Sequence, residues 1–190
     1  MSKRKRSNKK ISGFGALKKE LQSKSTQNLR NSQLKENEAM SYIQKGNLNE
    51  AEKIYLELIE RETQSHIVYG NLAAIYQMRG NKEKEQIIYL LKKALQLKPD
   101  FAQAHNNLGN ALKEKGDLNS AIDSYQNAIK LNPNFQNAHY NLGAALQKKG
   151  DLNSAINSYQ NAIKLNPDYQ EAHYNLGNAL QEKGCLLYTS

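Results

Sequence analysis

Residues 102–135 read AQAHNNLGNALKEKGDLNSAIDSYQNAIKLNPNF, and residues 136–169 read QNAHYNLGAALQKKGDLNSAINSYQNAIKLNPDY. The two stretches align without gaps and carry the same residue at 25 of 34 positions. A period of this length is typical of a solenoid, in which each repeat packs mainly on its neighbours. The sequence therefore predicts a chain built by stacking similar helical units.

Each repeat is predicted to hold two helices joined by a tight turn. The first helix is expected over Ala102–Lys115 and to end at Gly116, since glycine readily adopts the left-handed conformation that closes a helix. Asp117 offers a side-chain cap to the second helix. Asn132 and Pro133 end that helix, because proline cannot continue a helix and restricts the residue before it.

These repeats resemble the tetratricopeptide repeat, a unit of about 34 residues with large and small residues at fixed places. Small residues let helix axes approach to about 8–10 Å, and Leu and Tyr fill the remaining space. The resemblance implies an all-α, right-handed superhelix of about four and a half repeats whose concave groove binds partners. The matching residues are Leu108, Gly109, Leu112, Ala121, Tyr125, Ala128 and Pro133, and then Leu142, Gly143, Leu146, Ala155, Tyr159, Ala162 and Pro167.

The outer repeats match the pattern less well. In the second repeat two residues are inserted after Gly80, and Ile87 stands where the later repeats have a small Ala. We therefore expect a longer or bulged helix there. The array is expected to span residues 32–184, with repeats at 32–65, 66–101, 102–135, 136–169 and, in part, 170–184.

The chain starts with a basic segment and continues nearly neutral. Residues 1–40 hold 11 Lys and Arg against 3 acids, whereas residues 41–190 hold 16 against 15. Because dense like charges repel and few apolar groups offset the cost of ordering, residues 1–31 are expected to form a disordered leader. It lacks the apolar segment of a secretory signal, so cytoplasmic residence is the expectation.

Three roles of the leader stay open. It is a solubilising tail, a short apolar helix that docks on another surface, or a segment that holds nucleic acid or an anionic surface through residues 3–10. No apolar run reaches the roughly 18 residues of a membrane span, so no membrane-spanning segment is expected.

The last six residues, 185–190, match nothing in the earlier repeats. One back-translation of them spells the mosaic end of a transposase used in sequencing libraries, so we interpret them as a non-native tail. A genuine short tail is the alternative. On the first interpretation the chain is a fragment that continues after Gly184 with more repeats or a further domain.

One polar residue recurs at the same place in four repeats, as Asn71, Asn107, Asn141 and Asn175. An amide side chain has one acceptor and two donors, so it can bond both the C=O and the N–H of an extended peptide. The row resembles the asparagine ladder in the repeat arm of O-linked N-acetylglucosamine transferases, which implies peptide binding. Ordinary polar packing is the alternative.

Beside this row the two most similar repeats differ mainly on the first helix, where six of their nine differences lie. Five of these positions share one helix face. The resemblance implies that this face lines the concave groove, and we expect the residues there to select the partner, with drift at exposed positions as the alternative. The further candidate peptide-binding residues are Asn106, Asn110, Tyr140, Tyr174, Lys113 and Gln147.

We expect a non-enzymatic scaffold that binds a protein or an extended peptide in its groove. The alternative is the N-terminal, substrate-selecting arm of a larger enzyme, such as an O-linked N-acetylglucosamine transferase or another fused transferase. No phosphate loop, nucleophile elbow or metal-spaced Cys/His set is present, so no catalytic, cofactor or metal site is expected. The recurring His105, His139 and His173 are expected to make packing or polar contacts, because helices about 8–10 Å apart set them too widely for one zinc ion.

Overall fold

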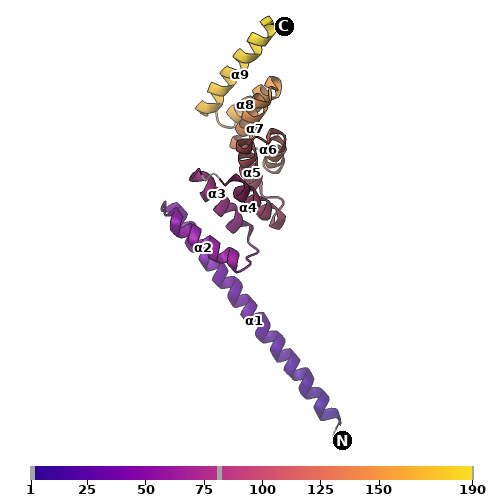
Figure 1. The fold of residues 1–190 in the computed structure, drawn as a ribbon. Helices are drawn as coiled ribbons and strands as arrows, with labels where there is room; N and C mark the ends of the chain where they lie inside the picture. Colours follow the sequence, from indigo (N-terminus) through magenta and orange to yellow (C-terminus); the bar gives the residue numbers. More distant parts are fainter. Residues whose placement is uncertain (1–2, 81–82, 190) are drawn as a thin grey trace. The chain divides into compact units, whose positions relative to one another are not determined.

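The computed structural model describes the backbone of residues 3–80 and 83–189 and the side chains of residues 18–80 and 83–184. The chain divides into an N-terminal body, residues 1–63, and a C-terminal body, residues 64–190. All regular structure in the described residues is α-helical (Figure 1), which confirms the all-α prediction. The helices are α1 (Lys3–Gln44), α2 (Leu48–Glu60), α3 (His66–Met78), α4 (Lys84–Leu97), α5 (Ala102–Lys115), α6 (Leu118–Leu131), α7 (Gln136–Lys149), α8 (Leu152–Leu165) and α9 (Gln170–Thr189).

Helix α1 has 42 residues and begins at Lys3. Lys, Arg, Leu and Gln all favour the helix, and no proline interrupts residues 3–31, so local propensity agrees with this helix. The side chains of residues 1–17 lie outside the described ones, and the disordered leader stays a prediction for residues 1–31.

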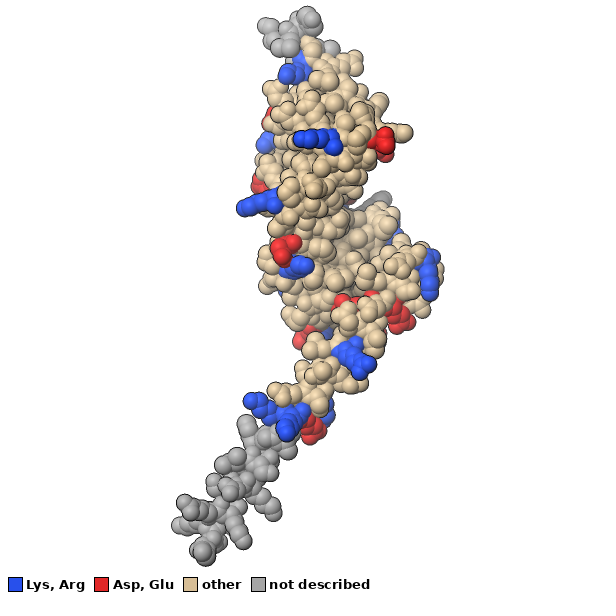
Figure 2. Space-filling model, turned by 180° about the vertical axis from the view of Figure 1, so that it is seen from behind, with Lys and Arg blue, Asp and Glu red and all other residues tan. Residues whose placement is uncertain are grey.

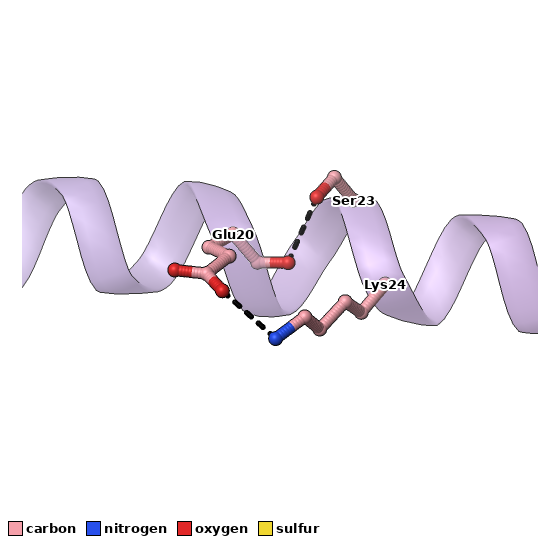
Figure 3. A network of polar contacts seen from close by, with 3 residues as sticks. All are labelled: Glu20, Ser23 and Lys24. Atoms are coloured by element: carbon pink, nitrogen blue, oxygen red, sulfur yellow. Dashed lines mark hydrogen bonds and ion pairs between the residues drawn. The ribbon is translucent and has the colours of Figure 1, made fainter.

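Local contacts along α1 are consistent with that propensity. Figure 3 shows Lys24 Nζ donating to Glu20 Oε1 at 2.8 Å and Ser23 Oγ donating to the Glu20 carbonyl oxygen at 2.8 Å. Ion pairs four residues apart stabilise an exposed helix by about 0.2–0.5 kcal/mol. Every side chain of residues 18–31 is exposed, so this part of α1 is held by such short-range interactions.

The first predicted repeat is a helix pair within the N-terminal body. Gly46, at φ +77°, provides the turn between α1 and α2. The two helices pack on each other, and burial of Ala39, Ala51, Tyr55 and Leu58 forms their core.

The C-terminal body is a stack of helix pairs. Each helix from α3 to α9 packs on the next, and α3 with α5, α5 with α7 and α7 with α9 are in contact as well (Figure 1). The first helices of successive repeats therefore lie along one side of the stack. This arrangement is the repeat superhelix that the sequence predicts.

The turn inside the third and fourth repeats follows the predicted chemistry. Gly116 and Gly150 have φ of +95° and +91°, where a side chain would be strained. Asp117 accepts a hydrogen bond from the Ser120 backbone N–H at 3.1 Å, and Asp151 accepts the equivalent bond in the next repeat. The predicted N-caps are confirmed.

Gly184 occupies the same repeat position but does not end its helix, because α9 continues to Thr189. The residue after Gly116 is Asp117, whereas the residue after Gly184 is Cys185. A thiol is a weak acceptor and cannot replace a capping carboxylate. The turns at Gly116 and Gly150 are thus each followed by a capping Asp that the position after Gly184 lacks.

The prediction of a longer or bulged helix in the second repeat is wrong. Helix α4 has 14 residues, as α6 has. The two extra residues belong to the connection 79–83, of which 81–82 lie outside the described residues. Ile87 is buried, and Leu91 stands where the later repeats have the larger Tyr, so the added volume at one position is offset at the other.

Glycine on the first helix is required by a close approach to a tyrosine ring. A Cβ at Gly109 would lie 2.5 Å from Tyr125 Cε1, and one at Gly143 would lie 2.7 Å from Tyr159 Cε1. Both rings are fully buried. The small residue therefore sets how closely the two helices of a repeat can pack.

Gly109→Ala should lower the free energy of unfolding by about 1–3 kcal/mol, because the Tyr125 ring has to move. The first repeat carries Ala39 and Tyr55 at these positions, so we expect a strained fold and not a lost one. Urea unfolding followed by circular dichroism measures the change.

The matched control for this substitution is Gly177→Ala, at the same repeat position in α9. A Cβ there meets nothing within 4 Å. Since alanine favours the helix, this change should be neutral or stabilise by up to about 1 kcal/mol. Equal losses for the two variants would show that the contact with Tyr125 is not what selects glycine.

Candidate functional site

The ten candidate residues all lie on the first helices of the C-terminal body. The four constant asparagines fall one on each of α3, α5, α7 and α9, and their side chains are half-buried. We call the surface formed by the ten residues the asparagine face. Its members are Asn71, Asn106, Asn107, Asn110, Lys113, Tyr140, Asn141, Gln147, Tyr174 and Asn175.

Hydrogen bonds join this face across two boundaries between repeats. Asn141 Nδ2 donates to Asn106 Oδ1 at 3.0 Å, and Asn175 Nδ2 donates to the Tyr140 hydroxyl oxygen at 3.0 Å. Part of the row therefore serves packing between repeats. An amide has two donors and one acceptor, so the side chains of Asn141 and Asn175 each keep their Oδ1 and one N–H for another partner.

Asn107 is held differently from the next two asparagines. Its Oδ1 accepts from Gln103 Nε2 at 2.9 Å and from Asn106 Nδ2 at 3.4 Å. Gln77 Nε2 donates to the backbone carbonyl oxygen of Asn107 at 2.9 Å. In the preceding repeat Gly70 stands at the place of Asn106, so no side chain there receives the Asn107 amide. Asn107 therefore keeps its two N–H donors.

Two buried tyrosines on the second helices orient further members of the asparagine face. The Tyr125 hydroxyl donates to Asn110 Oδ1 at 2.8 Å, and the Tyr159 hydroxyl donates to Gln147 Oε1 at 2.9 Å. Burial raises the pKa of both tyrosines far above the ordinary value, so the hydroxyls stay protonated. Because its oxygen is occupied, Asn110 presents its amide N–H groups.

The face changes from polar to aromatic between α5 and α7. Asn106 on α5 is replaced by Tyr140 on α7 and Tyr174 on α9. The Tyr140 ring lies 5.9 Å from that of Tyr159 and 5.1 Å from that of Tyr169, between centroids. Tyr174 is 71 % exposed.

Three residues outside the ten candidates bond to this face. They are Gln77 and Gln103, which donate to Asn107, and Glu182, which accepts from Gln147 Nε2 at 2.9 Å. Gln77 occupies the same repeat position as the candidates Lys113 and Gln147, so comparing the repeats by position would have found it.

The recurring histidines make the expected polar contacts. In His105, the ring atom Nε2 lies 3.0 Å from the carbonyl oxygen of Pro99. The same contact joins His139 to Pro133 at 2.9 Å and His173 to Pro167 at 2.8 Å. Because a carbonyl oxygen only accepts, Nε2 carries the proton. Each ring thus bonds the turn that precedes its own helix. Among the residues whose side chains are described, no cluster of three or more His, Cys, Asp or Glu has the arrangement of a metal site.

Charged side chains of both signs are interspersed over the face of the molecule seen in Figure 2. Nucleic acid or an anionic surface is considered above as a partner for residues 3–10, and the side chains of that segment lie outside the described ones. Among the described residues, no helix combines the length and apolar character that crossing a membrane requires.

Comparisons with known proteins agree with this architecture. The family described as "TPR repeat" matches residues 85–116, 109–150 and 146–184, and the one described as "Tetratricopeptide repeat" matches residues 33–64. No curated protein sequence matches the chain.

Three solved structures represent the similar folds. MamA aligns at a TM-score of 0.71 and 25% identity, covering 80% of this chain and 82% of MamA. YrrB, described as a TPR protein with an unusual peptide-binding site, aligns at 0.68 and 21% identity, covering 79% and 76%. The first TPR of Spaghetti (RPAP3), bound to the HSP90 peptide SRMEEVD, aligns at 0.61 and 21% identity, covering 64% and 94%.

The stacked helix pairs, the Gly–Tyr contacts that repeat within them and family matches over more than half of the residues lead to one conclusion: this chain belongs to the tetratricopeptide-repeat family.

Proposed function

We propose that this chain is a non-enzymatic, cytoplasmic scaffold that binds an extended peptide segment of a partner protein along the asparagine face. The observation that carries the proposal is a row of amides that packing orients but does not saturate. Asn107 keeps two N–H donors, and Asn141 and Asn175 each keep an acceptor and a donor. An extended peptide presents the complementary C=O and N–H groups on every residue.

The orientation of these amides before binding supports the proposal. Asn141 and Asn175 each donate one N–H to a residue of the neighbouring repeat, so their side chains are held on the asparagine face. A side chain that is ordered beforehand loses less entropy when the peptide binds. Contacts with the peptide backbone also tolerate many side chains, which suits a scaffold.

The proposed choice among peptides comes from the residues that vary beside the row. Tyr140 and Tyr174 offer aromatic surface for an apolar side chain of the peptide, while Asn110 offers amide N–H groups at the preceding repeat. Asn106 is buried, and its Oδ1 accepts from Asn141, so it positions that asparagine. Exchange of Tyr140 or Tyr174 should therefore change which peptides bind, whereas the asparagine row should act on all of them.

The structural neighbours support this class of function. YrrB is described as having a peptide-binding site, and the RPAP3 repeat was solved with a bound peptide. Both show the fold of this chain at 21% identity. They support peptide binding as a use of this fold.

The recurrence of asparagine at one place in four repeats also favours a second function, the substrate-selecting arm of a larger transferase such as an O-linked N-acetylglucosamine transferase. This function needs the same contacts with the peptide. The full reading frame at the source locus, sequenced without a transposase, distinguishes the two. A transferase domain in the same frame would support the arm, and a frame with repeats alone would reject it.

Selection from a library of displayed random peptides tests the proposed binding. The full chain is immobilised, and enriched peptides are titrated by calorimetry against the soluble chain. We expect saturable binding of unstructured peptides with unrelated sequences. A library that yields no binder above the level of a blank surface would reject the function.

A further inference from the structure

At the boundary between the third and fourth repeats, a pair of lysines stands where the next boundary has a glutamine and a glutamate. Near the end of α7, Gln147 Nε2 donates to Glu182 Oε1 on α9 at 2.9 Å. The corresponding residues one repeat earlier are Lys113 on α5 and Lys148 on α7. A hydrogen bond between repeats is thus replaced by two positive charges.

The preceding boundary shows that the lysine pair is the exception. There the corresponding residues are Gln77 and Glu114, again a glutamine and a glutamate. Three boundaries in one chain share a backbone plan, so their differences lie in these side chains. Only the boundary between the third and fourth repeats places like charges together.

Lys113 forms no ion pair with an acid in the described part of the chain. Its side chain is half-buried, and this burial lowers the pKa of Lys113; Glu114 acts in the opposite direction and Lys148 lowers it further. Neither lysine makes an ion pair with a described residue. A cation that is partly removed from water and close to another cation is stabilised when an anion binds beside it.

Neighbouring groups fit an anion at this point. Asn110 precedes Lys113 by one helical turn and presents amide N–H groups, because its Oδ1 accepts from the Tyr125 hydroxyl. Carboxylate and phosphate oxygens only accept hydrogen bonds, and those with charged donors are roughly twice as strong as neutral ones.

We propose that Lys113 and Lys148 bind one anionic side chain of the peptide that lies on the asparagine face. The inference rests on the proposed function and adds the class of ligand to it. The peptide carries an Asp, a Glu or a phosphorylated residue at the boundary between the third and fourth repeats. The aromatic part of the face, at Tyr140 and Tyr174, then receives an apolar side chain further along the same peptide.

The test compares the full chain with the variant Lys113→Gln/Lys148→Glu, which copies the pair found at the next boundary. Its control is Lys130→Gln/Lys164→Glu, which makes the same change of charge at exposed lysines on α6 and α8. All three proteins select peptides from one displayed library. A selected peptide is then titrated with Glu, Gln, phosphoserine or Ser at its enriched acidic position.

We expect Asp and Glu to be enriched by the parent and the control but not by the Lys113/Lys148 variant. The Glu peptide should bind the parent about tenfold more tightly than the Gln peptide, and the variant should lose this difference. The variant should also melt at the same or a higher temperature than the parent, since it removes a repulsion. If it does not fold, Lys113→Gln alone replaces it, because glutamine stands at this position in two other repeats.

Each outcome separates this inference from the proposed function. Binding of Glu and Gln peptides with equal affinity would overturn the anion site and leave peptide binding intact. If no peptide binds at all, both the anion site and the proposed function are overturned. A lysine-dependent preference for phosphoserine over both Ser and Glu would support the site and identify its anion as phosphate.

Discussion

Tyr125→Ala should lower the free energy of unfolding by about 3–5 kcal/mol. The ring is fully buried and fills the space that Gly109 leaves open, so its removal creates a cavity between the two helices of the third repeat. The change also removes the hydrogen bond from the hydroxyl to Asn110. Urea unfolding of the full chain, followed by circular dichroism, measures the loss.

Two matched variants separate the contributions of the ring. Tyr125→Phe keeps the packing and loses the hydrogen bond, so it should cost only about 0.5–1.5 kcal/mol. Tyr174→Ala removes a ring that is largely exposed and should change the stability by no more than about 0.5 kcal/mol. Similar losses for Tyr125→Ala and Tyr174→Ala would contradict the packing described for the repeat.

Replacing Asn107, Asn141 and Asn175 together by Ala should weaken peptide binding by about 1.5–4.5 kcal/mol. Each hydrogen bond between an amide and the peptide backbone contributes about 0.5–1.5 kcal/mol, and the estimate assumes that the three effects add. The loss should be similar for peptides of unrelated sequence, because the row contacts backbone groups. Calorimetric titration of several selected peptides measures it.

The triple variant also loses two hydrogen bonds between repeats, from Asn141 to Asn106 and from Asn175 to Tyr140. Its folding therefore has to be checked by its melting temperature. The matched control replaces three exposed asparagines on the second helices, Asn127, Asn153 and Asn161, by Ala. Unchanged affinity in a folded triple variant would reject the row as a peptide contact and leave these asparagines as packing residues.

Features of the fold that depend on residues adjacent in the sequence could be predicted from it. The end of α5 and the start of α6 follow from Gly116 and Asp117, which act within one turn of their helices. Gly184 shows the limit of a prediction from one residue, because α9 continues through the position where α5 and α7 end.

The candidate site could be predicted as a row but not as a set of donors and acceptors. The position of Asn141 on a first helix follows from the repeat, whereas its bond to Asn106 joins residues 35 apart in the sequence and depends on how the repeats stack. The same holds for the contact of Gln147 with Glu182. The pairing of Lys113 with Lys148 follows from that contact, because the two lysines occupy the positions of Gln147 and Glu182 one repeat earlier.

Removal of single backbone N–H groups from the bound peptide tests the central claim most directly. A selected peptide is synthesised with one N-methylated residue at a time, which deletes a donor and keeps the side chain, and each version is titrated against the full chain. The proposal predicts weakened binding at the N–H groups that face Asn141 and Asn175, and no further loss from those methyl groups in the triple asparagine variant. Equal affinity for every N-methylated version would contradict it.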